Sequence, residues 1–138
     1  MTTLLLVAHG GLAAALVIVS VFTVRARSAE RLRKTTSLLL CLLAAQTVLG
    51  YVLYPLYLRE VKPALHALNA GARSVADIFE VKEHLAFFAL AMTLGAFYAA
   101  RDEVGEAGPI VRVLVAGAHA AIVIVVTLGL VVASMRLP

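Results

Sequence analysis

The sequence of 138 residues is short of charge, because only 14% of its residues are charged while 62% are hydrophobic. A soluble domain has about 25% charged and about 45–50% apolar residues. The composition therefore excludes an ordinary soluble domain, and the length leaves no room for a second one. We expect a single integral membrane domain over residues 1–138, with the lipid bilayer as its surroundings.

Cysteine is nearly absent as well, since Cys41 stands alone inside an apolar run. One cysteine excludes an intramolecular disulfide and any paired-cysteine motif, so we interpret Cys41 as a small apolar residue. The start of the chain also lacks the positive residues that precede the apolar core of a cleavable signal peptide. The first apolar run is therefore expected to remain as a membrane helix.

The sequence lacks the features that are typical of nucleic-acid binding, of transport and of nucleophilic hydrolysis. The net charge is +4, but no basic helix or basic-aromatic stretch presents a surface for a nucleic acid, so we expect no such partner. No filter sequence or broken mid-membrane helix indicates a channel or transporter. Ser20, Ser37 and Ser134 have no evident histidine and acid partners at matching depth, which counts against nucleophilic hydrolysis.

What the sequence does have is four apolar segments, at about residues 4–24, 35–58, 77–100 and 110–135. Three of them exceed the roughly 20 helical residues that a bilayer core of about 30 Å requires. The third has only 16 uncharged residues, from Leu85 to Ala100, so it spans only if its helix begins near Asp77. The pattern predicts an all-α fold, an up-down-up-down four-helix membrane bundle, with a short interfacial helix at about residues 60–70.

The links between these segments carry most of the charge. Residues 25–34 hold five positive side chains and one negative one. Links rich in Lys and Arg remain in the cytoplasm. We therefore expect both termini and the link at residues 59–76 to lie outside, on the periplasmic side of a bacterial inner membrane.

Ionisable residues just before Leu85 form the most distinctive stretch. The three- and four-residue spacing of one helix face is followed by Asp77, Glu80, Glu83, His84 and Phe87. Lys82 falls elsewhere on the helix, where its long stem can reach outward to the interface. Ionisable groups at a membrane boundary are costly and indicate a functional site.

Histidines lie on three of the four apolar segments, and their positions indicate that the functional site could bind haem. With each helix midpoint at the bilayer centre, His9 and His84 both lie about 7 Å toward the outside, and His119 about 5 Å toward the cytoplasm. Two imidazoles at one level can ligate haem iron, glycines can open a slot for the ring, and arginine can bind the propionates. The candidate haem-binding residues are His9, His84, His119, Gly10, Gly11, Gly117 and Arg59.

The layout, with histidines on several helices and a basic link, resembles that of small four-helix membrane b-type cytochromes. The resemblance is one of layout and histidine placement. We expect a protein that binds haem b and passes electrons to or from quinol, or to a partner at the outer face. His9 and His84 are the favoured axial ligands, with His119 as a substitute.

Two other kinds of site use the same residues. Carboxylate and imidazole ligands suit a non-haem metal or a proton site, for which the candidate ligands are His9, His84, His119, Glu80 and Glu83. The other helices lack an internal carboxylate, which counts against a dinuclear centre. A quinone headgroup is the second possibility, with Tyr54, Arg59, Glu80, Glu83 and His84 gathered around it.

The competing interpretation is structural. Histidines can be polar contacts between helices, with His119 bonded to Gln46 and His84 bonded to an acid. The protein would then be a non-catalytic helical subunit that assembles with a larger membrane complex or as a homo-oligomer.

Overall fold

The computed structural model describes the backbone of residues 2–63 and 70–134, and their side chains except at positions 2, 60, 61, 70–76, 79, 132 and 134. These residues form four long helices and one short π-helical turn. In chain order they are α1 (Thr2–Arg25), α2 (Ala29–Leu56), η1 (Tyr57–Val61), α4 (Ala70–Ala99) and α5 (Pro109–Ser134). The predicted all-α fold with four long helices is confirmed. Most of the predicted interfacial helix at 60–70 lies outside the described residues.

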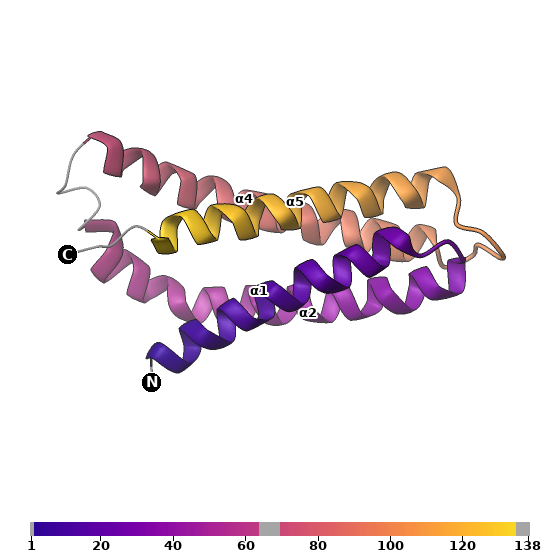
Figure 1. Cartoon of the computed structure of the whole chain (residues 1–138), viewed down its shortest axis with the longest axis horizontal. Coiled ribbons are helices and arrows are strands. Elements are labelled where there is room, and N and C mark those ends of the chain that lie inside the picture. Colours follow the sequence, from indigo (N-terminus) through magenta and orange to yellow (C-terminus); the bar gives the residue numbers. More distant parts are fainter. Residues whose placement is uncertain (1, 64–69, 135–138) are drawn as a thin grey trace.

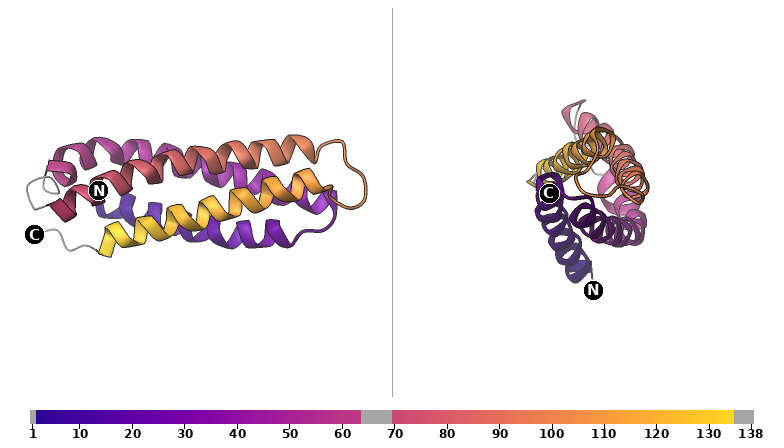
Figure 2. Two further views of the ribbon diagram at one scale, coloured as in Figure 1. Left: turned by 90° about the horizontal axis from the view of Figure 1, so that it is seen from above. Right: turned by 90° about the vertical axis from the view of Figure 1, so that its right-hand side faces the viewer.

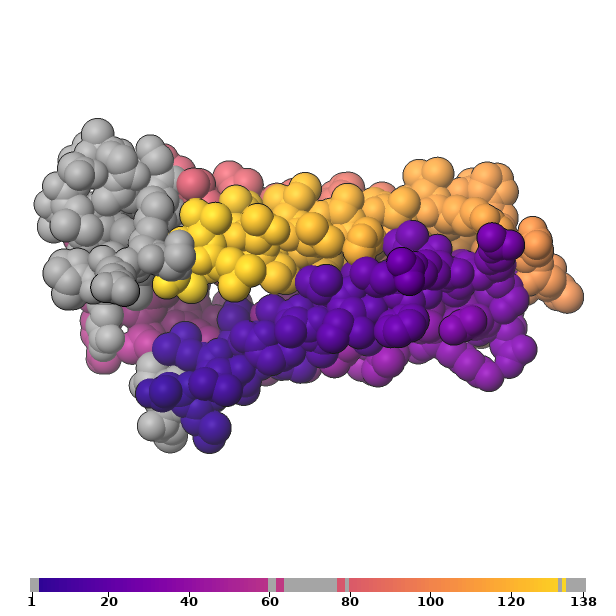
Figure 3. Space-filling model, viewed as in Figure 1, coloured from indigo at the N-terminus to yellow at the C-terminus, as the bar shows by residue number. Residues whose placement is uncertain are grey.

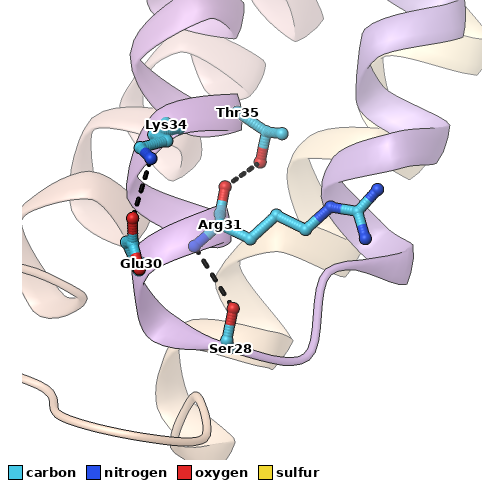
Figure 4. Close-up of polar contacts among 5 residues, drawn as sticks. All are labelled: Ser28, Glu30, Arg31, Lys34 and Thr35. Atoms are coloured by element: carbon cyan, nitrogen blue, oxygen red, sulfur yellow. Dashed lines mark hydrogen bonds and ion pairs between the residues drawn. The ribbon is translucent and has the colours of Figure 1, made fainter.

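Helix α2 begins six residues earlier than the apolar pattern predicts, because Ser28 caps it. Ser28 has extended backbone, and its hydroxyl accepts a hydrogen bond from the Arg31 amide at 3.3 Å (Figure 4). A serine cap satisfies one of the amides that a helix start leaves unpaired. Glu30 stands in the first turn and pairs with Lys34 at 2.7 Å, so most of the basic link is helical.

Pro55 lies inside the last turn of α2, which runs on to Leu56. Proline has no amide proton, and its ring collides with the carbonyl of the preceding turn. The chain continues as the π-helical turn η1, where the Lys62 amide donates to the Tyr57 carbonyl five residues back. The helix therefore continues beyond Pro55, and its hydrogen bonds change from the α-helical to the π-helical pattern in η1.

The helices run antiparallel to their sequence neighbours, and α5 closes the ring by packing on α1 (Figures 1 and 2). α1 and α4 therefore lie diagonally across the bundle, with no contact between their described residues. We call the end that holds the links after α1 and α4 the basic end, and the opposite end, near the N-terminus, the terminal end (Figure 1). The basic end carries Arg25, Arg27, Arg31, Arg33 and Lys34.

Two apolar clusters form the core. Near the basic end, Leu32, Val111 and Val115 pack with alanines of α4. In the middle, Leu16, Leu39, Leu43, Ala89, Ala121 and Ile122 pack together. Small residues on α4 and α5 allow these helices to approach closely, as in membrane bundles generally.

The terminal end is more open than the rest. Neither core cluster contains a residue of α1 before Leu16 or of α2 after Leu43. α1 leans away from the other helices toward its N-terminus (Figures 1 and 2). Figure 3 shows a hollow between the start of α1 and the end of α5, with α2 visible behind it.

The outer surface of the bundle is apolar. Three helical spans are long and apolar enough to cross a membrane, namely Thr3–Arg25, Ala29–Arg59 and Pro109–Val131. Large exposed side chains on them include Leu4, Val48, Val113 and Leu130, each more than half exposed. α4 has 30 residues and is long enough to cross a membrane, but its described residues are not apolar enough to count as a fourth span.

Arg33 fixes the link between α4 and α5 at the basic end. Its Nη1 donates to the carbonyls of Ala100 and Arg101 at 3.3 Å and of Glu103 at 3.1 Å. The Ala29 amide donates to the Gly105 carbonyl at 2.8 Å, and Gly105 has the positive φ of 84° that glycine adopts readily. This end is therefore closed by hydrogen bonds between links.

Candidate functional site

His9 of α1 and Gln46 of α2 contact each other inside the terminal half of the bundle. Gln46 Nε2 lies 3.2 Å from His9 Nε2. With the amide as donor, the imidazole carries its proton on Nδ1. Within the described part of the chain, His9 Nδ1 and Gln46 Oε1 are both buried and have no hydrogen-bond partner. A Cβ at Gly50 would lie 3.8 Å from His9 Cε1, an ordinary van der Waals contact, so the ring lies directly beside α2.

Lys82 of α4 reaches the same level of the bundle. Its Cδ lies 4.0 Å from the position of a Cβ on Gly129 of α5, so its stem packs against that helix. The prediction that Lys82 points outward is wrong. Lys82 precedes the buried Ala89 by seven residues, so it lies on the face of α4 that packs inward. We call His9, Gln46 and Lys82 the interior polar site.

The acidic stripe that the sequence singles out lies on the opposite face of α4. Glu80 and His84 are exposed, and Glu83 is half-buried. His84 Nδ1 donates to the Glu80 backbone carbonyl at 2.8 Å, and the Glu80 carboxylate accepts from Lys62 at 3.1 Å. The hydrogen bond from Lys62 to the Glu80 carboxylate and the negative charge of Glu80 raise the pKa of Lys62.

The structure does not bring His84 to His9. Their helices are diagonal in the bundle, since sequence neighbours take the adjacent places, and His84 faces outward. Equal depth along two helices therefore does not make their residues neighbours. Tyr54 and Tyr57 lie with ring centroids 6.0 Å apart at the terminal end, and Arg59 is exposed on η1.

His119 of α5 binds Ser20 of α1, with 2.8 Å between Nδ1 and the hydroxyl oxygen. Ser20 also donates to the Val17 carbonyl at 2.8 Å and is 1% exposed. The expected contact of His119 with Gln46 is therefore wrong, because His119 binds Ser20 instead. In the described residues no acid hydrogen-bonds to this pair, so it joins two helices without forming a catalytic triad.

The three glycines do not line a common slot. Gly10 and Gly11 are exposed, and a Cβ at either would meet open space. Gly117 packs closely against the side chain of Met92. The space beside Gly117 is thus filled by protein, and that beside Gly10 and Gly11 lies outside the bundle.

The candidate metal ligands are dispersed in the same way. Across the described residues, no three His, Cys, Asp or Glu side chains lie close enough to hold a metal ion. His9 faces α2, His119 faces α1, and His84 faces outward with Glu80. Lys82 is the residue whose face the sequence interpretation did not identify, although its spacing of seven residues from Ala89 and fourteen from Ala96 was the signal for the inward face.

The fold and its surface define a class, a four-helix bundle of the membrane type with a polar site in its interior. No family model, curated protein or solved structure matches this chain.

Proposed function

We propose that this integral membrane protein binds the headgroup of a quinol or quinone at the interior polar site. The observation that carries the proposal is the pair of buried atoms without a partner, His9 Nδ1 and Gln46 Oε1. Leaving such an atom unpaired costs about 1–3 kcal/mol, so a ligand that pairs both is strongly favoured. Lipid tails cannot pair them.

The chemistry of the site suits a hydroxyl group on an aromatic ring. A quinol hydroxyl can donate to Gln46 Oε1 while its oxygen accepts from His9 Nδ1. The Lys82 ammonium is a third donor, suited to a quinone carbonyl or to the oxygen of a deprotonated quinol. The hollow between α1 and α5 supports access for such a lipophilic molecule from the bilayer (Figure 3). The predicted quinone site thereby moves from the outer stripe of α4 to the interior.

Binding of a short-chain quinone to purified protein in nanodiscs tests this proposal. His9→Leu and Lys82→Met each remove a donor, so each should weaken the Kd about tenfold or more. His84→Leu and Lys62→Met are matched controls, because they change an exposed histidine and a half-buried lysine that lie outside the interior polar site. We expect both controls to remain within about twofold of the unchanged protein. Equal weakening by all four variants, or no saturable binding, would overturn the proposal and leave water as the occupant.

Haem b remains part of the proposal as a prediction. Among the three candidate histidines, His9 is the one with a buried ring nitrogen without a partner in the described chain, so it is the axial ligand we favour. Haem is an alternative to the quinone at this nitrogen, because Nδ1 cannot donate a proton to a hydroxyl and give its lone pair to iron at the same time; a haem held there would supply one-electron chemistry. Oxidised and dithionite-reduced absorption spectra of protein produced with ample haem test it. Absence of a Soret band, or a normal spectrum in His9→Ala, would reject this ligand assignment.

We also propose an orientation. The cluster of five positive side chains supports a cytoplasmic basic end, with the terminal end and the interior polar site in the outer half of a bacterial inner membrane. In this arrangement α4 crosses the membrane inside the bundle, although its own composition is too polar to mark it as a span.

A further inference from the structure

The positive side chains of the basic end differ in their partners. Lys34 pairs with Glu30 at 2.7 Å, and Arg112 lies 3.8 Å from Glu106. At the corner between α1 and α2, three exposed arginine side chains form no ion pair or hydrogen bond with an acid of the described chain. We call them the arginine patch; it consists of Arg25, Arg27 and Arg31. The patch leaves this corner with an unbalanced positive charge.

Arg25 and Arg31 lie at one level of the antiparallel helices α1 and α2. The contact of His9 with Gln46 sets the register of the two helices. Arg25 lies sixteen residues after His9, and Arg31 lies fifteen residues before Gln46, so the two arginines are level. Figure 4 shows the Arg31 side chain extending from α2 toward the end of α1. The charge of Arg31 is therefore directed toward the helix that ends with Arg25.

This level is also a boundary of the membrane. The apolar span Thr3–Arg25 ends at Arg25. Ile18 and Phe22 precede Arg25 by seven and three residues, so the three side chains share one face of α1. Ile18 is 57% exposed and Phe22 is 53% exposed. Arg25 thus stands at the polar end of an apolar row that faces the lipid.

Helix α2 has the same arrangement. Its apolar span begins at Ala29, two residues before Arg31. Leu38 follows Arg31 by seven residues on the same face, and it is 51% exposed. In the register of the two helices Leu38 is level with Ile18 of α1. Two apolar rows therefore run from the arginine patch toward the middle of the membrane.

We infer that the arginine patch binds the phosphate of an anionic phospholipid, whose acyl chains lie along these two rows. Guanidinium groups bind phosphate oxygens through parallel N–H donors. Basic clusters beside membrane helices attract anionic headgroups. The exposed apolar rows below the patch favour a lipid over a soluble anion, which has no chains to cover them. They also favour a lipid over an acidic protein, which would contact the charges alone.

Fluorescence quenching by brominated lipids tests this inference. The chain has no tryptophan, so Phe22→Trp introduces a single fluorophore beside the patch. In nanodiscs that mix phosphatidylcholine and phosphatidylglycerol, brominated phosphatidylglycerol should quench this tryptophan more than brominated phosphatidylcholine at equal mole fraction. Leu94→Trp on α4 is the control, because Leu94 is also large and 43% exposed. Ala96, two residues further on, packs in one cluster with Leu32 of α2, so the control lies at a similar depth.

We expect the two brominated lipids to quench the Leu94→Trp protein equally. Equal quenching of the Phe22→Trp protein would overturn the inference. An equal excess of phosphatidylglycerol at both positions would also overturn it, because the lipid would then gather around the whole basic end without a site.

Charge variants in the Phe22→Trp protein identify the residues that hold the headgroup. Arg25→Gln and Arg31→Gln should each lower the preference for phosphatidylglycerol about fivefold. Arg101→Gln is the matched control, because it removes an exposed arginine from the same end but from the link between α4 and α5. We expect this control to keep the preference. Circular dichroism confirms that each variant keeps its helical content. An equal loss in all three variants would reduce the effect to general attraction and contradict the site.

Inorganic phosphate distinguishes a lipid from a soluble anion. Added at the same ionic strength as a chloride control, it should leave the quenching by brominated phosphatidylglycerol as the chloride does. Removal of the phosphatidylglycerol excess by phosphate alone would assign the patch to a soluble phosphate and overturn the lipid. No residue of the arginine patch belongs to the interior polar site, so failure here leaves the quinone proposal intact.

Discussion

Ser20 and His119 join α1 to α5 in the middle of the bundle, and their hydrogen bond makes a prediction at the scale of one residue. Interhelical hydrogen bonds in membrane proteins contribute about 0.6 kcal/mol on average and up to about 1.7. Because Ser20 is buried, Ser20→Ala leaves His119 Nδ1 without a partner, and the loss should lie near the upper value. Thermal unfolding in detergent measures it as a lower midpoint.

Ser37 provides the matched control for this change. Its hydroxyl donates only to the Arg33 carbonyl of its own helix at 2.8 Å. Ser37→Ala should therefore unfold at nearly the same temperature as the unchanged protein. If both alanine variants have equal midpoints, the contact between Ser20 and His119 does not stabilise the bundle.

Lys82 and His84 show what a sequence can and cannot predict about a site. The three- and four-residue spacing correctly separates them onto different faces of α4, but it does not say which face packs inward. Ala89, Thr93 and Ala96 decide this, because their small side chains let α4 pack closely on its neighbours. They align with Lys82, so its stem packs against α5 while His84 stays exposed.

At the scale of elements, the link between α4 and α5 depends on Arg33. The guanidinium binds three carbonyls of this link, and bonds from a charged donor are worth more than neutral ones. We expect Arg33→Ala to lower the free energy of opening the link by about 1–2 kcal/mol. Cleavage by trypsin after Arg101 should then become about tenfold faster, as followed by mass spectrometry.

Lys34 is the control for this prediction. Its ammonium pairs with Glu30 on the same helix, and both side chains are largely exposed. Lys34→Ala removes a positive charge from the same end, but it should leave the cleavage rate after Arg101 nearly unchanged. Equal rates in the Arg33 and Lys34 variants would mean that the link is held by other contacts.

The four helices themselves were predictable from the apolar runs, because each run must form a helix to pair its own backbone in lipid. Which helices lie next to each other could not be predicted from the apolar runs alone. The sequence argument compared depths along the first and third helices, but short links make consecutive helices adjacent and leave these two diagonal. The start of α2 was missed because Ser28 lies in a charged stretch where the apolar pattern gives no signal.

At the scale of the whole molecule, the two ends of the bundle differ in a way that suits binding at one of them. The basic end is closed by Arg33, by the bond between Ala29 and Gly105, and by an apolar cluster. The terminal end has an inclined α1, a hollow beside it and polar groups from three helices. A ligand bound at the interior polar site, as proposed, would leave the packed half undisturbed.

The crossing of α4 provides the test of the whole arrangement. If α4 spans the membrane, Pro63 before it and Val104 after it lie on opposite sides, while Ser28 and Val104 share one side. Single cysteines at these exposed positions, with Cys41→Ala, can be labelled by a membrane-impermeant maleimide in intact cells and in inverted vesicles. We expect Pro63→Cys to react from outside, and Ser28→Cys and Val104→Cys only in inverted vesicles. Labelling of Pro63→Cys and Val104→Cys from the same side would leave α4 outside the bilayer. The exposed Glu80 and His84 would then face water.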